Sequence, residues 1–369
     1  MKEIPAISVI IPMYNAEKYI SECLNSLLEQ TFKNFEVIVV DDCSTDNSVE
    51  IVKNYAEKFN GRLKIMNLPT NSGTGGYLPR NRGFALSRGE YVFFVDSDDF
   101  ITKTALQELY SAAKNSDADV VYIAARYQYK TDKNPEIKFD KIGKTLREKG
   151  IEDKITLEID NPKKILQNLL IEDALHWEPW SKFVKRDFLI KNEINFAEIL
   201  SGGDFVWTIE LSCRTKRFLR FVNPVYFWRD DSKDSIIRKN RPIDKQINFW
   251  MSVIISGSIV LKNLSNKIEL LNQNPIYCYR GINLWFNWCF NSRCFNERMK
   301  IRSEEFYEIL RREFAKNDND FGLTIPFLCS IIDRQQKNLM VTQQRFNNFA
   351  KQAQKRIAEL ENELNKIKN

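Results

Sequence analysis

The chain has 369 residues, a formal net charge of +6 and 43% hydrophobic residues. This length supports one large domain with an appendage or two modest domains, and the composition excludes wholesale disorder. The basic excess is mild and spread over many residues, so no nucleic-acid partner is expected. The single histidine excludes a zinc site built on several histidines.

The cysteines and the apolar stretches indicate where the protein works. Seven cysteines occur without a C-x-x-C pair, which favours reduced thiols. The N-terminus lacks a signal pattern, and the longest apolar stretches, 251–262 and 324–332, are too short to span a bilayer. We expect a cytoplasmic protein. The basic charge leaves open a peripheral placement at the inner face of the cytoplasmic membrane.

The first third of the chain alternates between strand and helix patterns. Runs of β-branched and aromatic residues predict strands at 7–11, 35–40, 63–68, 91–95 and 119–125. Apolar stripes at helical spacing predict helices at 16–30, 49–59, 79–88 and 103–115. Repeated β-α-β units of this kind predict an α/β fold, with a doubly wound, mostly parallel sheet and helices on both faces.

The middle of the chain is less regular. Residues 128–160 are polar and lysine-rich without clear periodicity, which predicts a long loop or insertion. Residues 161–240 return to mixed structure with many aromatic side chains. The segment 241–340 is expected to be a helical region, with amphipathic stretches at 246–262 and 279–290.

The last segment, 341–369, has a heptad pattern. Apolar residues from Phe346 to Ile367 follow alternating spacings of four and three, with charged residues between them. This pattern predicts a short coiled coil that supports a homo-oligomer or binds a partner helix. The alternative is a helix that packs back on the body of the same chain.

Polar and acidic residues follow three of the predicted strands. The first strand ends in Pro12 to Asn15, the second in Asp41-Asp42, and the fourth in Asp96 to Asp99. Ligands of doubly wound sheets bind beyond the carboxyl ends of the strands. Three carboxylates within 96–99 are costly without a cation, and their oxygen atoms suit Mn²⁺ or Mg²⁺. The alternative makes Asp98 and Asp99 caps of the next helix.

A glycine-rich loop at 71–76 precedes Arg80. Glycine allows close approach of the backbone to a ligand, and arginine suits phosphate or base contacts. No Gly-Lys-Ser/Thr follows, which argues against the phosphate loop of nucleotide hydrolases. No G-x-G-x-x-G follows the first strand, so a nicotinamide-binding fold is disfavoured.

Four ordered stretches together resemble family two of the inverting glycosyltransferases, which have a GT-A fold. They are Ser8–Asn15, Val40–Asp46, Asn71–Gly83 and Val95–Asp99. The resemblance implies a GT-A domain over 1–240, with a donor-binding half at about 1–125 and an acceptor half at about 160–240. It implies transfer from a nucleotide-diphosphate sugar, most often a UDP-sugar, to a hydroxyl of a bacterial surface glycan. Capsule, lipooligosaccharide and lipid-linked glycans are the expected acceptor classes.

The resemblance also implies roles for individual residues. The nucleotide base is expected beside Pro12, Tyr14, Asp41 and Asp42. Arg80 is expected near the base or diphosphate, Asp96 near the ribose and the metal, and Asp98 as the main metal ligand. Arg238 is expected in a loop that closes over the diphosphate.

The expected catalytic base is Asp204, which would remove the proton of the acceptor hydroxyl. Similar enzymes have a glutamate before this aspartate, and here Gly203 replaces it. The alternative is a turn aspartate that follows two glycines. Trp180 and Lys182 match a Trp-Asn-Lys element of the family, and with Glu178 they are expected to contact the acceptor.

Two other functions compete with the transferase. One is a non-catalytic sugar-nucleotide-binding or assembly subunit, which Gly203 favours and the retained Asp98 and Asp204 oppose. The other is a nucleotidyltransferase, which typically has a glycine-rich loop directly after the first strand. Pro12 to Asn15 is not such a loop.

Overall fold

The computed structural model describes most of the first 230 residues and a smaller part of those that follow. The described residues are 4–148, 156–159, 161–170, 172, 175–230, 253, 256–257, 259–289 and 352. The chain divides into two compact units, Met1–Ile309 and Leu310–Asn369, and every described residue except Gln352 belongs to the first. The expected coiled coil at 341–369 therefore lies outside the described residues, apart from Gln352, and the boundaries at 240 and 340 remain predictions.

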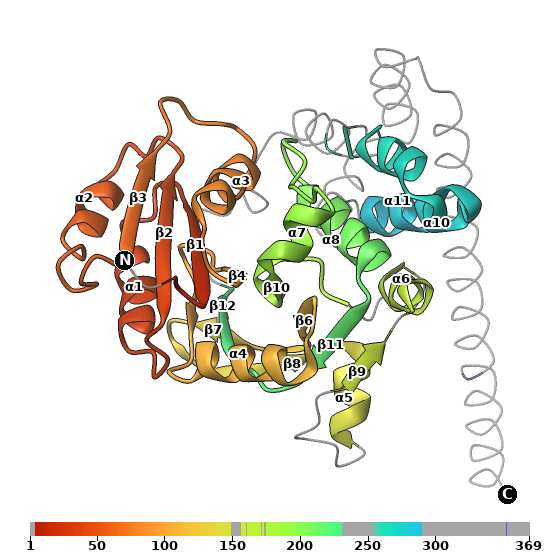
Figure 1. Ribbon diagram of the computed structural model, residues 1–369, viewed down its shortest axis with the longest axis horizontal. Coiled ribbons are helices and arrows are strands. Elements are labelled where there is room, and N and C mark those ends of the chain that lie inside the picture. The colour runs from red at the N-terminus through yellow and green to blue at the C-terminus, as the bar shows by residue number, and fades with distance from the viewer. Residues whose placement is uncertain are drawn as a thin grey trace, which may run out of the picture. The chain divides into compact units, whose positions relative to one another are not determined.

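An eight-stranded mixed sheet forms the centre of the first unit (Figure 1). Its strands, in spatial order, are β3 (Leu63–Asn67), β2 (Phe35–Asp41), β1 (Ile7–Met13), β4 (Tyr91–Phe94), β10 (Lys182–Lys185), β6 (Val120–Ile123), β11 (Arg217–Phe221) and β9 (Thr156–Ile159). The first four strands are parallel, as are β6 and β11. β10 enters antiparallel between β4 and β6, and β9 pairs antiparallel with β11.

Side-chain alternation along β2 explains why helices cover both faces of the sheet. Val37 and Val39 join a large core cluster that includes apolar residues of α1 and α4. Ile38 and Val40 point to the opposite face, where Leu78 of α3 packs against them. Successive side chains of a strand point to opposite faces, so a strand that is apolar throughout requires cover on both sides.

The helices confirm the β-α-β order and correct several expected ends. They are α1 (Ile20–Leu28), α2 (Ser48–Lys53), α3 (Tyr77–Leu86), α4 (Ala105–Ser116), α5 (Lys141–Glu148), α6 (Pro162–Leu170), α7 (Arg186–Lys191), α8 (Gly203–Arg214), α10 (Glu269–Gln273) and α11 (Ile276–Cys289). Residues 259–267 are also helical, in agreement with the expectation for 246–262. Within the described part of the chain, no helix is long and apolar enough to cross a membrane.

A second sheet overturns the prediction of a loop at 128–160. β7 (Ala125–Lys130) and β8 (Lys133–Phe139) form an antiparallel hairpin, and β12 (Tyr226–Arg229) pairs with both β7 and the short β5 (Phe100–Ile101). β8 is mostly exposed, so it lacks the buried alternation by which a strand is recognised in a sequence. Its conformation depends on pairing with β7 in the hairpin rather than on a pattern of buried and exposed residues.

Candidate active site

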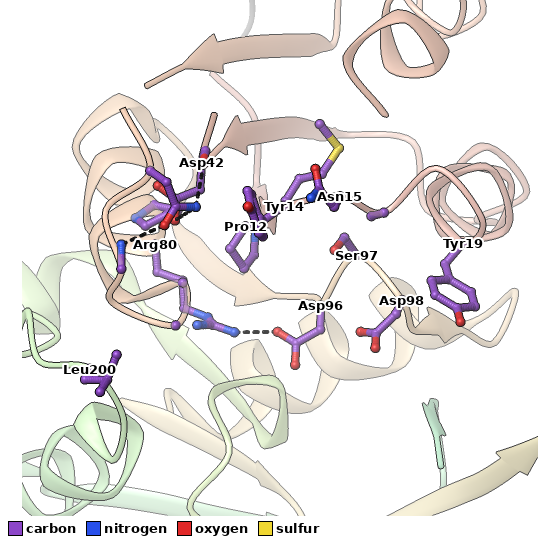
Figure 2. A pocket seen from close by; sticks show the side chains of 17 residues that line it. Pro12, Tyr14, Asn15, Tyr19, Asp42, Arg80, Asp96, Ser97, Asp98 and Leu200 are labelled. Carbon is purple, nitrogen blue, oxygen red and sulfur yellow. Dashed lines mark hydrogen bonds and ion pairs between the residues drawn. The ribbon is translucent and has the colours of Figure 1, made fainter. Parts of the chain in front are cut away.

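One pocket of about 550 Å³ lies at the carboxyl ends of β1, β2 and β4, as the strand-end residues predict (Figure 2). Its lining includes five of the expected donor-site residues together with the expected main metal ligand. These residues are Pro12, Tyr14, Asp42, Arg80, Asp96 and Asp98. Tyr14 is 48% exposed and therefore presents its ring to solvent at the pocket. These six predicted residues thus line one pocket.

Asp42 fixes the glycine-rich loop at one side of the pocket. Its carboxylate accepts hydrogen bonds from the backbone N–H of Ser72 and from the Ser72 hydroxyl, both at 2.8 Å. The Asn71 amide also donates to the Asp42 carbonyl at 2.9 Å. Gly73, Gly75 and Gly76 of this loop all adopt positive φ and line the pocket. The loop therefore requires glycine for its backbone conformation and brings main chain close to a bound ligand.

Arg80 and Asp96 form an ion pair across the pocket. The Arg80 Nη2 to Asp96 Oδ1 distance is 2.5 Å, and Arg80 is buried (Figure 2). A Cβ at Gly76 would lie 2.8 Å from Arg80 Nη1, so glycine at position 76 makes room for the guanidinium. The Nε atom of Arg80 is buried without a hydrogen-bond partner in the described part of the chain. The pocket thus contains a positively charged guanidinium group that is suited to bind a phosphate.

The carboxylates of 96–99 have two different surroundings. Asp99 is buried and accepts bonds from the Tyr226 hydroxyl and the Arg229 backbone N–H, both at 2.8 Å. Burial, followed by the charges of Asp98 and Asp96, raises the pKa of Asp99 well above its usual range. Tyr226 also accepts a bond from the Asp96 N–H at 3.1 Å. Asp99 therefore attaches the loop to β12 and does not line the pocket.

Asp96 and Asp98 project into the pocket from the segment after β4 (Figure 2). The described residues contain no group of three or more metal-ligating side chains. Two carboxylates with the phosphate oxygens of a substrate are nevertheless a common Mg²⁺ or Mn²⁺ environment, since these ions take few protein ligands. The residues present fit such a cation at a site completed by a diphosphate.

Asp41 does not line the pocket. Asp41 is buried, and its Oδ2 accepts a bond from the Ser44 N–H at 3.1 Å. It supports the turn after β2, so the structure differs from the expected contact with a base. Arg238 lies outside the described residues.

Asp204 lies in the first turn of α8 and is partly buried. Its Oδ1 accepts hydrogen bonds from the Tyr77 hydroxyl at 3.1 Å and from the Phe205 N–H at 2.9 Å. Burial raises the pKa of Asp204, the charge of Glu178 adds to this effect, and the two hydrogen bonds oppose it. A carboxyl with a raised pKa is suited to accept a proton.

Trp180 and Lys182 are buried in the structure, in contrast to the prediction that they contact an acceptor. Their exposed fractions are 1% and 2%. Trp180 stacks on Tyr226 at 4.5 Å between ring centroids, and the Lys182 ammonium donates to the carbonyls of His176 at 2.6 Å and Glu178 at 3.1 Å. Both side chains therefore pack inside the fold, and neither lines the main pocket.

Glu178, the third expected acceptor residue, reaches a cavity. It lines a separate pocket of about 250 Å³ with His176, Trp177 and Asp140. Its Oε2 atom is buried without a hydrogen-bond partner in the described part of the chain. Burial alone would raise the pKa of Glu178, but interactions with His176, Arg126 and Lys182 outweigh it and lower this pKa. The residue stays a candidate for contact with a polar ligand.

Several residues of the site had no role assigned to them from the sequence. Asn15, Tyr19 and Leu200 line the main pocket, and Tyr77 contacts Asp204. Asn15 adopts a positive φ of 48°, which asparagine tolerates, and its side-chain carbonyl accepts a bond from the Thr45 N–H. Its place at the end of the stretch Pro12 to Asn15 was the signal for Asn15 in the sequence. Leu200 and Tyr77 are placed by long-range packing, which no local pattern reveals.

Comparisons with known proteins agree with this geometry. The family model described as glycosyl transferase family 2 matches residues 8–170. The Escherichia coli (strain K12) protein named uncharacterized glycosyltransferase YibD is 30% identical over 270 residues, which are 73% of this chain and 71% of YibD. The chain belongs to glycosyl transferase family 2. This membership confirms the predicted family, and the sheet with its strand-end pocket confirms the predicted fold.

Another relative matches about a third of the chain at higher identity. Poly(ribitol-phosphate) beta-N-acetylglucosaminyltransferase TarS of Staphylococcus aureus is 50% identical over 118 residues. These are 31% of this chain and 20% of TarS, so the matched part spans about a fifth of that relative. A crystal structure of S. aureus TarS 1–349 in complex with UDP-GlcNAc aligns with a TM-score of 0.57 and 27% identity, covering 81% of this chain and 77% of that chain.

Proposed function

We propose that this family-2 chain transfers a sugar from a UDP-sugar to a hydroxyl of a bacterial surface glycan. The observation that carries the proposal is the strand-end pocket, in which a glycine-rich loop, Arg80 and the Asp96–Asp98 carboxylates meet. The UDP-GlcNAc complex of TarS supports a UDP-sugar donor. Capsule, lipooligosaccharide and other lipid-linked glycans remain candidate acceptors, beside the poly(ribitol-phosphate) named for TarS.

The pocket supplies the groups that such a donor needs. The base would lie beside Pro12, Tyr14 and Asp42, and Arg80 would face the diphosphate. Asp98, with Asp96, would hold Mn²⁺ or Mg²⁺ against the phosphate oxygens. Such a cation stabilises negative charge on the departing diphosphate.

Asp204 would act as the base in an inverting displacement. The acceptor oxygen attacks the anomeric carbon, and its proton passes to the Asp204 carboxylate. As the new C–O bond forms, the bond between the anomeric carbon and the diphosphate oxygen breaks, and its electron pair leaves with UDP. Arg80 would stabilise that developing charge through its guanidinium.

Binding tests the donor assignment first. We would measure the melting temperature of the full chain with UDP, UDP-GlcNAc, ADP and GDP, each with and without Mn²⁺. A ligand that binds only the folded state stabilises it by about 2.7 kcal/mol at 100 times its dissociation constant. We expect a Mn²⁺-dependent increase with UDP and UDP-GlcNAc only.

The variant Asp98→Asn tests the metal assignment. It should remove the Mn²⁺-dependent part of UDP binding, because an amide is a poorer ligand for a hard cation than a carboxylate. The matched control is Asp187→Asn, an exposed aspartate of α7 outside the pocket, which should bind UDP as the wild type does. Unchanged Mn²⁺-dependent affinity in Asp98→Asn would refute the assignment.

Turnover separates the transferase from a non-catalytic binding subunit. UDP release from UDP-GlcNAc would be followed with poly(ribitol-phosphate) and with other surface glycans as acceptors. Asp204→Asn should bind UDP normally and release it only at a small residual rate. UDP binding by the wild type without any acceptor-dependent release would favour the non-catalytic subunit.

A further inference from the structure

Tyr77 connects the donor pocket to the expected base. It is the first residue of α3, directly after Gly76 of the glycine-rich loop. Its hydroxyl accepts a hydrogen bond from the Gly202 N–H at 3.0 Å and donates one to Asp204 Oδ1 at 3.1 Å. One buried side chain therefore spans from the helix that carries Arg80 to the N-terminus of α8.

The ring of Tyr77 also accounts for glycine at position 203. A Cβ at Gly203 would lie 2.9 Å from Tyr77 Cδ2 and 3.0 Å from Tyr77 Cε2. The same Cβ would lie 2.8 Å from the carbonyl oxygen of Ala197. These distances are shorter than ordinary carbon contacts. Any larger residue at 203 would displace the tyrosine or the backbone of Ala197.

The surroundings of Tyr77 hold its ring in one place. The ring stacks on Phe196 with 5.9 Å between centroids and 17° between planes. The Asn81 side chain of α3 exchanges two hydrogen bonds of 2.9 Å with the backbone of Phe196. The Arg80 guanidinium lies 5.9 Å from the centre of each of these two rings. A hydroxyl on so constrained a ring can fix the direction of a carboxylate.

We propose that Tyr77 is the positioning residue for Asp204, and that Gly203 is a glycine because the tyrosine ring occupies the space beside it. The inference rests on the proposed function, in which Asp204 is the base. Both hydrogen bonds to the carboxylate fall on Oδ1 within the described part of the chain. Oδ2 accepts no hydrogen bond there, so we assign it to the proton of the acceptor hydroxyl.

The charges around Asp204 give the expected direction of a pH effect. Glu178 raises the pKa of Asp204, whereas Arg80 and the hydrogen bond from Tyr77 lower it. The Lys182 ammonium also lies within electrostatic range of Asp204, and burial lowers the pKa of that lysine to about 7. Removal of the Tyr77 hydroxyl therefore raises the pKa of Asp204.

The test is Tyr77→Phe in the full chain, which keeps the ring and removes the hydroxyl. We expect kcat for UDP release to fall by about 10- to 100-fold, as for the loss of a hydrogen bond to a charged group. KM for UDP-GlcNAc and Kd for UDP should stay within about twofold, since the pocket lining is unchanged. The acid limb of kcat/KM against pH should move to higher pH.

Two further variants separate positioning from general packing. Tyr55→Phe is the matched control, because Tyr55 is also buried and donates its hydroxyl to a side chain, Asn25, at 3.1 Å, outside the pocket lining. It should leave kcat unchanged. The double variant Tyr77→Phe/Asp204→Asn should have the same kcat as Asp204→Asn alone, because Tyr77 acts through Asp204.

The possible failures are distinguishable. Wild-type kcat and pH profile in Tyr77→Phe, or losses that multiply in the double variant, would overturn the positioning role while leaving the transferase intact. If Tyr77→Phe lowers UDP affinity and kcat together, the tyrosine supports the pocket as a whole and the inference is wrong. A wild type that binds UDP but releases none with any acceptor would refute the proposed function, and the positioning role with it.

Discussion

Acidification should destabilise the folded chain through its single histidine. His176 is packed beside Trp180, and Arg126 Nη1 lies 3.0 Å from Nε2 and 3.2 Å from Nδ1 of its ring. Since arginine only donates, the imidazole must accept at the nitrogen that bonds to it, which favours the neutral ring. Burial, with smaller contributions from Arg126 and Lys182, lowers the pKa of His176 from 6.5 to about 4, although Glu178 opposes the change.

The sign of the effect follows from proton binding in the two states. An unfolded histidine binds a proton near pH 6.5, whereas folded His176 binds one only near pH 4. Between these values the unfolded state holds more protons, so the free energy of unfolding falls as the pH falls. This difference between the two pKa values corresponds to about 3 kcal/mol of the free energy of unfolding. About 2 kcal/mol of it is lost between pH 7 and pH 5.

Two measurements check this prediction. The ring carbon resonance of the only histidine gives its pKa directly by NMR, and we expect a midpoint near pH 4. Urea unfolding of the wild type and of His176→Gln at pH 7 and pH 5 isolates the contribution of the imidazole, because other groups titrate equally in both proteins. The difference in stability between the two proteins should change by about 2 kcal/mol. A midpoint near 6.5, or a difference independent of pH, would refute the reasoning.

Two substitutions test the packing that supports the site. Gly83→Ala should lower the free energy of unfolding by about 1–3 kcal/mol in urea, since the added Cβ would overlap Ile10 Cγ2. The control Arg82→Ala, at the exposed neighbouring position, should stay within about 0.5 kcal/mol of the wild type. Equal stability of the two variants would contradict this packing. Arg220→Met should cost about 3–5 kcal/mol, because it leaves the buried Asp140 carboxylate without its ion-pair partner. Adding Asp140→Asn should recover part of that loss in thermal unfolding, and no recovery would show that Asp140 is not the cause.

The sequence alone determined the architecture of the donor half. β1 and β2 are mostly apolar, and the structure pairs them in parallel over seven residues each. This pattern is a local property, because a strand buried on both faces is apolar at most of its positions. The acids after β2 and β4 also predicted the pocket, because parallel strands place their carboxyl ends at one edge.

Only the tertiary structure decided which carboxylates face the pocket. The sequence does not distinguish Asp96, Asp98 and Asp99 from one another. In the structure Asp99 is buried and accepts a hydrogen bond from Tyr226, which is 127 residues away in the chain. Asp41 likewise turns to its own loop, whereas its neighbour Asp42 lines the pocket. The direction of a side chain after a strand depends on the neighbours available for hydrogen bonding, which local patterns do not contain.

The acceptor half shows the same limit more strongly. Trp180 and Lys182 match a family element, and burial makes them part of the core. Gly203 departs from the family pattern in the sequence, and its cause is the ring of Tyr77, 126 residues earlier. The sequence shows which residue types are available for a site. Whether a given side chain reaches the ligand is decided by long-range packing, because a buried position is defined only by the segments that cover it.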